Sequence, residues 1–480
     1  MNLHTGHLSC CVSGQNFYDQ AMKILIQHAD VITPTERFMA DLFLEDGRIS
    51  AVGSGLSAGV KPDRVINAYG FLVFPGGVDP HVHMHLSTAA GFSSDNFESG
   101  SKAALLGGTT TLIDFVTPRR GQSLTHALAE RRAEAAESLV DHGLHVSPVE
   151  WRESLPMEID ACMMAGVSTF KVYMAYKDAI GVDTEVLEKI MIKVGRAGGM
   201  VTLHAEMGDE IDRLRDDLFA KGQREPSAHP LSRPPHTESQ AVAKAIELSE
   251  KTGCPLYIVH VSAEESVNLI RKARHKGLKV SAEACPHHLL LDESRYSGEF
   301  QDAAPYVLSP PLRGKADREA LWEALADGTI QVVGTDHCPF MMAQKETGLE
   351  DFRKIANGAG SVEHRLALLY TYGVLEGRIS IHRFVELVSA APAGIFGLTS
   401  RKGSLQPGAD ADLVIWNPVH ESTISAATHQ QRCDHNIFEG FKVKGRAEYV
   451  IARGEVAVEN GRLNPPAKGS YLHRNPLPKP

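Results

Sequence analysis

The stretch FPGGVDPHVHMH, residues 74–85, decides how the rest of the chain is interpreted. We expect a strand that leaves a hydrophobic interior, bends at the proline and two glycines, and ends at His81 and His83. Because successive strand side chains point to opposite faces, these two imidazoles lie on one face. Neutral imidazole nitrogens bind zinc-like ions, so the pair could be half of a metal site. Taken alone, an ordinary pair of polar strand residues is the better interpretation, and the other ligands must come from elsewhere.

Downstream of this stretch, apolar runs of about five to seven residues alternate with helix-like segments, a pattern typical of strand-helix repeats and a parallel sheet. The eight runs are residues 76–83, 109–115, 143–149, 168–174, 200–206, 255–261, 278–284 and 330–336. Eight parallel strands with intervening helices predict an α/β fold, a closed (β/α)8 TIM-like barrel.

The segments on either side of the barrel resemble each other, since both contain short alternating runs separated by glycine-rich turns. We predict that they meet in one small β-sandwich domain, where each covers the hydrophobic face of the other. The predicted divisions are an N-terminal extension (1–20), the first sandwich part (21–74), the metal-dependent barrel (75–400), the second sandwich part (401–464) and a proline-rich C-terminal arm (465–480). The arm either lies on a neighbouring subunit or is a disordered tail.

Composition excludes several classes of partner. The chain has 49 basic and 59 acidic residues, a formal charge of -10, and no long basic run, which argues against nucleic acid and anionic membranes. No apolar run reaches the roughly eighteen residues of a spanning helix, and no signal peptide is recognisable, so we expect a cytoplasmic protein. Its seven cysteines form no zinc pattern and are expected to be reduced thiols.

Polar side chains stand at the ends of several predicted barrel strands, where barrel enzymes gather their chemistry. His204 ends the fifth strand, His260 the sixth and Asp336 the eighth. Each has an ordinary explanation taken singly, as a satisfied strand residue or a helix cap. Together with His81 and His83 they predict a convergent metal site.

Lys171, within the fourth strand, is the most informative position. A lysine ammonium in a crowded metal site would repel the cations and be costly to desolvate. One interpretation is that its amine has condensed with carbon dioxide, giving a carbamate whose two oxygens bridge two metal ions. The alternative is a packed stem whose ammonium reaches water.

With these positions assigned, the chain resembles the dihydropyrimidinase and D-hydantoinase (phenylhydantoinase) family of cyclic amidohydrolases, from about Lys23 to about Leu463. The motifs that carry the resemblance are FPGGVDPHVH, GGTTTLIDFV, FKVYMAY, VTLHAE, LYIVHVS, YVLSPPLR, GTDHCPF and GADADLVIW. The resemblance implies hydrolysis of dihydropyrimidines or 5-substituted hydantoins to N-carbamoyl amino acids. It also implies two divalent metals, usually zinc, a small-molecule cyclic amide substrate, and a homo-oligomer, either a tetramer or a dimer.

The resemblance also implies a role for each site residue. His81, His83 and Asp336 would bind one metal, His204 and His260 the other, with carbamylated Lys171 and a hydroxide bridging both. Asp336 would transfer the proton. Tyr176 would stabilise the oxyanion, and the backbone at Ser309 and Asn357 would hold the amide edge of the ring.

Substrate choice is less well defined. The dihydroorotase branch commonly has HxHxR, and His85 stands here in place of the arginine, which counts against dihydroorotate. We expect the loop from Met84 to Asn96, with Tyr173 and Ile180, to shape the pocket for the ring substituent. The alternatives are an allantoinase or other cyclic-amide hydrolase of the same superfamily, and a noncatalytic assembly protein like the collapsin response mediators, whose lost ligands this chain retains.

Overall fold

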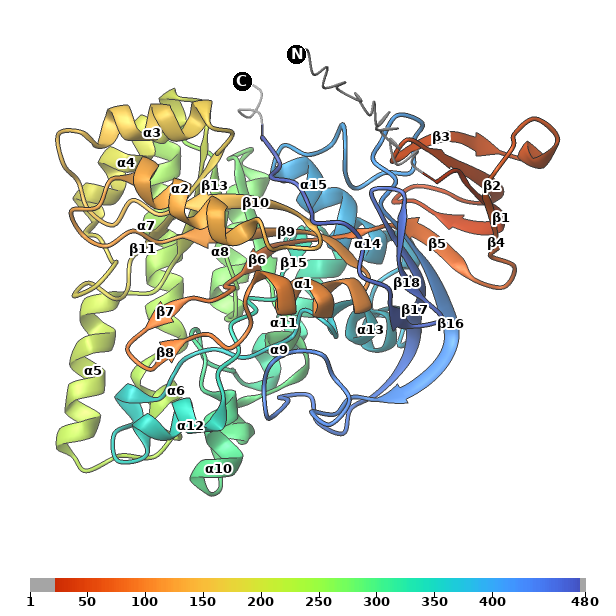
Figure 1. The fold of residues 1–480 in the computed structure, drawn as a ribbon. Coiled ribbons are helices and arrows are strands. Elements are labelled where there is room, and N and C mark those ends of the chain that lie inside the picture. The colour runs from red at the N-terminus through yellow and green to blue at the C-terminus, as the bar shows by residue number, and fades with distance from the viewer. Residues whose placement is uncertain (1–21, 475–480) are drawn as a thin grey trace, which may run out of the picture.

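The computed structural model describes residues 22–474, so the predicted extension at 1–20 lies outside the described residues. The chain forms a barrel and a second sheet beside it (Figure 1). The barrel strands are β6 (Gly77–Val82), β9 (Thr109–Val116), β10 (Asp141–Val146), β11 (Thr169–Tyr173), β12 (Met200–His204), β13 (Leu256–Ile258), β14 (Val280–Ala284) and β15 (Val332–Val333). These are the eight predicted strands, in sequence order and all parallel, so the barrel prediction is confirmed.

The barrel closes between its first and last strands just beyond the end of β15. The His83 N–H donates to the His337 carbonyl at 2.8 Å, and the Thr335 hydroxyl donates to the Asp79 carboxylate at 2.6 Å. Strands such as β9 are buried along their whole length, as expected where helices cover one face and the barrel interior fills the other. The carboxyl ends of all eight strands therefore meet at one mouth.

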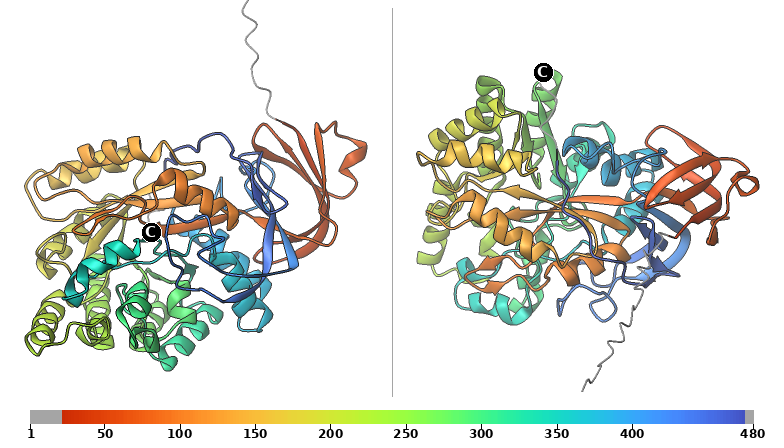
Figure 2. Two further views of the ribbon diagram at one scale, coloured as in Figure 1. Left: turned by 60° about the horizontal axis from the view of Figure 1, so that its bottom comes forward. Right: turned by 45° about the horizontal axis from the view of Figure 1, so that its top comes forward.

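Helices surround the barrel and extend its loops (Figure 2). They are α1 (Phe97–Leu106), α2 (Leu124–Ala135), α3 (Leu155–Met164), α4 (Thr184–Arg196), α5 (Gly208–Ala220), α6 (Ala228–Ser232), α7 (Pro235–Thr252), α8 (Glu264–His275), α9 (Pro286–Leu290), α10 (Phe300–Ala303), α11 (Lys315–Ala326), α12 (Met342–Lys345), α13 (Arg365–Leu369), α14 (Ile381–Val385) and α15 (Ala391–Ile395). None of the helices between residues 22 and 474 is long and apolar enough to cross a membrane.

The second sheet combines strands from both ends of the chain. They are β1 (Ile24–Ile32), β2 (Arg37–Glu45), β3 (Arg48–Gly53), β4 (Arg64–Asn67), β5 (Leu72–Pro75), β16 (Leu413–Thr423), β17 (Lys442–Ala452), β18 (Glu455–Glu459) and β19 (Arg462–Leu463). Their shared core includes Ile26 and Leu42 from the first part and Leu413 and Ile451 from the second. Each part thus covers the apolar face of the other, as the sequence predicted.

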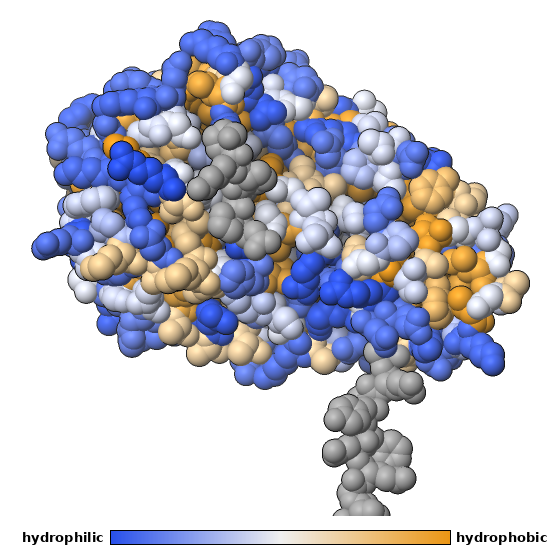
Figure 3. Space-filling model, turned by 90° about the horizontal axis from the view of Figure 1, so that it is seen from above, coloured by the Kyte–Doolittle hydropathy of each residue, from blue (hydrophilic) through white to orange (hydrophobic). Residues whose placement is uncertain are grey.

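The second sheet is mixed, because two of its strands run parallel to a neighbouring strand. β4 and β5 both pair with β1 in parallel, β4 along residues 24–27 and β5 along residues 30–31. After the β2–β3 hairpin, the chain crosses to the other edge of β1 and runs beside it in the same direction. Exposed apolar side chains on this sheet include Phe38, Met39 and Val65. Figure 3 shows hydrophobic residues at the end of the molecule where the sheet lies.

The opening stretch, residues 74–85, joins the two parts. Phe74 in β5 pairs with Val414 in β16, and three residues later the chain enters the barrel at Gly77. Gly76 lies so close to Thr110 that any Cβ there would collide with the threonine side chain. The glycine therefore permits the close approach of the two segments.

The C-terminal segment up to Arg474 lies against its own barrel and not away from it. The Leu472 N–H donates to the His142 carbonyl at 2.7 Å, and the His142 N–H donates to the Ser470 carbonyl at 3.0 Å. Leu472 is fully buried among Val78, Ile113 and other residues at the amino ends of the strands. Residues 469–474 of the predicted arm are thus ordered on their own barrel, and residues 475–480 lie outside the described residues.

We expect Leu472→Ala to lower the free energy of unfolding by about 2–4 kcal/mol, because it removes a fully buried side chain and leaves a cavity. Thermal unfolding followed by circular dichroism measures the change. The matched control is Lys468→Ala in the same segment, where an exposed ion pair with Glu137 is lost and little change is expected. Equal unfolding temperatures in both variants would show that the segment does not contribute to the fold.

Candidate active site

A cavity of about 680 Å³ opens at the mouth of the barrel. All nine residues that the sequence nominated line it: His81, His83, Lys171, Tyr176, His204, His260, Ser309, Asp336 and Asn357. They come from the ends of six different strands or from the loops that follow them. The structure therefore brings together side chains that are up to 276 positions apart, from His81 to Asn357.

Asp336 stands between the two histidines of the opening stretch. Its Oδ1 lies 3.1 Å from Nε2 of His81 and 3.1 Å from Nε2 of His83. One ligand atom from each of the three residues lies within 4.8 Å of the others. Asp336 has a φ of 49°, in the left-handed region, which aspartate tolerates better than most residues. This conformation at a strand end turns the carboxylate toward the two rings.

His204, His260 and Lys171 face the same cavity from the other side. Nδ1 of His204 lies 2.9 Å from Nε2 of His260. Lys171 is 1% exposed and forms no ion pair within 4.0 Å in the described part of the chain. Its Nζ lies 4.9 Å from the centre of the Phe115 ring and 5.0 Å from that of Tyr173. The side chain is therefore buried in the wall of the cavity.

Two buried glutamates that the sequence analysis missed orient the histidines. Glu283 contacts Nδ1 of His81 and accepts a hydrogen bond from the Tyr257 hydroxyl at 2.8 Å. Glu206 lies 2.7 Å from Nε2 of His204 and forms an ion pair with Arg233. Carboxylates in this position fix the orientation of metal-binding imidazoles. Both could have been noticed in the sequence, because Glu206 in VTLHAE and Glu283 in LKVSAEA are acidic residues within predicted apolar strands.

The charges of the cavity perturb the pKa values of its groups. Burial alone would lower the pKa of His81, but the carboxylates of Glu283 and Asp336 outweigh it and raise that pKa to about 9. Burial would raise the pKa of Asp336, but the neighbouring His81 and His83 hold it well below its usual value. Burial lowers the pKa of Lys171 to about 8. A larger fraction of its amine is therefore neutral near pH 7 than for an exposed lysine.

The histidine nitrogens fit a metal centre. Nε2 of His81, which faces Asp336 across 3.1 Å, is buried and makes no hydrogen bond. Unpartnered buried polar atoms are costly unless something else satisfies them. Imidazole and carboxylate groups are the ligands that zinc-like ions take. The donor set therefore suits a divalent metal centre better than it suits a site without metal.

Tyr176, Ser309 and Asn357 form one side of the cavity. The Ser309 hydroxyl donates to the Asn357 side-chain oxygen at 3.0 Å. Tyr176 has a φ of 61°, and the Arg233 guanidinium lies 5.2 Å from the centre of its ring. Burial raises the pKa of Tyr176, so its hydroxyl keeps its proton and can act as a hydrogen-bond donor.

The loop after the opening stretch divides into two parts. Residues 86–90, together with Tyr173 and Ile180, line the cavity as expected for a loop that shapes it. His85 does not line it. Its ring stacks on Phe92 with centroids 4.0 Å apart, and its side chain is 42% exposed on another surface. The side chain at the arginine position of the HxHxR pattern thus lies outside the cavity here.

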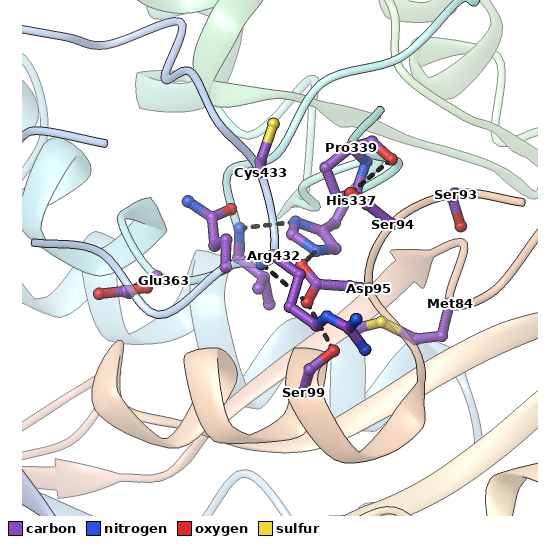
Figure 4. A network of polar contacts seen from close by, with 12 residues as sticks. Met84, Ser93, Ser94, Asp95, Ser99, His337, Pro339, Glu363, Arg432 and Cys433 are labelled. Carbon is purple, nitrogen blue, oxygen red and sulfur yellow. Dashed lines mark hydrogen bonds and ion pairs between the residues drawn. The ribbon is translucent and has the colours of Figure 1, made fainter. Parts of the chain in front are cut away.

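A second set of residues that the sequence did not predict surrounds His337, the residue that follows Asp336 in the chain (Figure 4). The adjacent His337 is fully buried, and its Nε2–H donates to Asp95 at 3.0 Å. Its Nδ1 accepts from the Ser361 N–H at 3.1 Å, which identifies the tautomer. Asp95 also accepts from the Ser99 hydroxyl at 2.7 Å. Through its bond to Asp95, His337 connects the segment that carries Asp336 to the 84–96 loop.

The fold and this donor set together define a class of protein, the metal-dependent hydrolases that work at the mouth of a barrel. The model of the amidohydrolase family matches residues 72–457. Curated relatives include a D-hydantoinase from Geobacillus stearothermophilus, 41% identical over 94% of this chain and 97% of the relative, and a dihydropyrimidinase from Arabidopsis thaliana, 36% identical over 95% and 86%. The chain belongs to the amidohydrolase family, in its D-hydantoinase and dihydropyrimidinase group.

Solved structures agree with this assignment over the whole described fold. A dihydropyrimidinase from Brevibacillus agri superposes with a TM-score of 0.94 at 37% identity, covering 96% of this chain and 100% of that one. An L-hydantoinase from Arthrobacter aurescens gives a TM-score of 0.85 at 29% identity, covering 94% and 100%. The sandwich and the barrel are therefore arranged as in these enzymes.

Proposed function

We propose that this protein opens a cyclic amide ring, hydrolysing dihydropyrimidines or 5-substituted hydantoins to N-carbamoyl amino acids. The observation that carries the proposal is the single cavity of about 680 Å³ in which candidate metal ligands, a proton-transfer group and ring-binding groups all meet. The names of the relatives, D-hydantoinase and dihydropyrimidinase, support the same reaction. No feature of the cavity favours the allantoinase alternative.

The proposal includes two divalent ions, with zinc as the expected metal. His81, His83 and Asp336 would hold one ion, His204 and His260 the other, and Lys171, as a carbamate, would contact both. When bound, the ions supply Lewis acidity, polarising the carbonyl and lowering the pKa of water. We propose carbamylation because Lys171 is buried without a carboxylate partner, and a carbamate would turn that unpaired cation into an anion.

The residues of the chain would act on the ring as follows. Asp336 would take the proton of the attacking water and later deliver it to the departing ring nitrogen. Tyr176 would donate its hydroxyl hydrogen to the carbonyl oxygen as negative charge develops there. The backbone at Ser309 and Asn357 would hold the amide edge of the ring. The ring substituent would lie against residues 86–90, Tyr173 and Ile180, a mainly apolar surface.

We also propose a homo-oligomer, a dimer or a tetramer. The exposed apolar side chains of the second sheet, including Phe38 and Met39, support it, because contiguous apolar surface is typical of interfaces between subunits.

The test is ring opening by the purified protein. Dihydrouracil, 5-phenylhydantoin, allantoin and dihydroorotate are supplied in parallel, and ultraviolet absorbance follows the loss of each ring. We expect turnover of dihydrouracil or 5-phenylhydantoin, with little of the other two. Metal analysis should find about two divalent ions per chain, and a strong chelator should abolish activity until zinc is restored. Full activity without metal, or no opening of either ring by the metal-loaded protein, would contradict the proposal.

A further inference from the structure

Lys345, at the end of the short helix α12, is a buried lysine with an unusual set of partners. It is 0% exposed, and its Nζ donates to three backbone carbonyls, those of Val307 at 3.1 Å, Ala356 at 2.9 Å and Gly358 at 2.9 Å. A lysine ammonium has three N–H donors and no acceptor. The three carbonyls therefore satisfy it completely, and only in its charged form.

These three carbonyls belong to the two segments that carry the ring-binding groups. Val307 lies two residues before Ser309, and Ala356 and Gly358 flank Asn357. The segments also touch directly, because the Gly358 N–H donates to the Val307 carbonyl at 3.0 Å. Lys345 thus fixes one backbone to the other immediately beside the cavity.

The ammonium pays a desolvation cost without a counter-ion. Lys345 forms no ion pair within 4.0 Å among residues 22–474, unlike Lys402, the other buried lysine with close polar partners. Burial lowers the pKa of Lys345 to about 7. The three carbonyl acceptors match the protonated amine. An apolar side chain would avoid this cost but would leave the carbonyls of Ala356 and Gly358 without the donor that Lys345 provides.

The surroundings leave the two segments little room to adjust by themselves. Gly358 has a φ of 144°, and a Cβ at this position would collide with the carbonyl of Cys338, two residues from Asp336. Ser309 and Asn357 are already joined by their side chains at 3.0 Å. A change in the spacing between the segments would therefore be transmitted to the wall of the cavity.

We propose that Lys345 is a positioning residue for the substrate: it holds the Ser309 and Asn357 segments at the separation that the amide edge of the ring requires. Lys345 does not line the cavity, so it acts through the backbone of these segments. The inference rests on the proposed function and deepens it, because it makes binding of the ring depend on a residue outside the cavity.

The test compares Lys345→Met with Lys402→Met. Lys402 is also buried, but its Nζ lies 2.6 Å from Asp141 and 3.0 Å from Asp410 at the junction of barrel and sandwich. Losing either ammonium destabilises the fold, which thermal unfolding measures. We expect only Lys345→Met to raise KM for the ring substrate, by about tenfold or more, with kcat changed by less than about threefold and the metal content unchanged.

Lys345→Gln, which keeps two N–H donors, should restore part of the lost affinity, and it is the variant to use if Lys345→Met fails to fold. Hydrogen exchange gives a readout that needs no substrate. Peptides covering residues 305–312 and 354–360 should exchange faster in the Lys345 variants than in Lys402→Met. If the wild-type protein opens no ring, the proposed function fails while exchange still tests the tether. Unchanged exchange in these peptides, or equal KM changes in both methionine variants, would overturn the proposal.

Discussion

Replacing Lys171 with alanine is expected to lower kcat by at least about 10³-fold while the barrel remains folded. The side chain is buried at the centre of the cavity, and as a carbamate it would be the one group that contacts both metal ions. Alanine removes the bridging anion without removing any histidine. In the metal-free protein it also removes an unpaired buried amine, so the free energy of unfolding of that form should change little or rise.

Activity, metal content and thermal unfolding are measured on the same preparation. The matched control is Lys177→Ala, six residues along the chain, where the lysine lies at the surface and pairs with Asp209 at 2.6 Å. Short carboxylates such as acetate or formate supply the same two-oxygen anion, so they should restore part of the activity of Lys171→Ala and none of that of His81→Ala. Labelled bicarbonate should give a carbamate carbon signal by NMR in the wild-type protein alone. Full activity of Lys171→Ala would reject the bridging role.

Local pattern was sufficient to predict the barrel and the residues at its mouth. An apolar run bounded by turn residues specifies a strand, and eight of them in a strand-helix alternation leave few folds to choose from. His81, His204 and Asp336 could be assigned because the end of a barrel strand is a defined place in three dimensions. Once the strands were known, these side chains had to converge.

Contacts between distant segments could not be predicted in the same way. Glu283 and Asp95 are polar residues whose partners, His81 and His337, lie roughly 200 and 240 positions away along the chain. An acidic residue within an apolar run marks Glu283 as unusual, but the local sequence does not show which side chain its carboxylate contacts. Leu472 posed the same problem, because the prolines around it predict extended chain but not the surface that the chain covers.

The orientation of His85 also could not be predicted from the alternation of side chains along a strand. Residues 81, 83 and 85 would share a face if the strand continued, but β6 ends at Val82 and His85 has a φ of 49°. The turn redirects its side chain onto Phe92, away from the cavity. The same positive φ at Asp336 has the opposite consequence, since it directs that carboxylate toward His81 and His83. The positive φ values that follow β6 and β15 therefore determine that Asp336 faces the cavity and His85 does not.

Asp336→Asn is the second change expected to have a large effect, a fall in kcat of about 10³-fold. Asparagine has the same shape and also tolerates a left-handed φ, so the backbone at 49° should be preserved. What it lacks is the negative charge and the ability to accept a proton from the attacking water. Alanine would be a poorer test, because it would add backbone strain to the loss of the carboxylate.

Metal content separates the two roles of this carboxylate. Asp336→Asn is assayed at saturating zinc, with bound metal measured in parallel, and compared with His83→Ala, which removes a ligand but no proton acceptor. If Asp336 transfers the proton, the asparagine variant should remain nearly inactive even when it holds two ions per chain, whereas activity of the His83 variant should recover with bound metal. Equal activity per bound ion in the wild type and in Asp336→Asn would show that the carboxylate only holds metal. Another group would then have to carry the proton from the attacking water to the ring nitrogen. Tyr176, whose hydroxyl lies in the same cavity, is the first candidate to test.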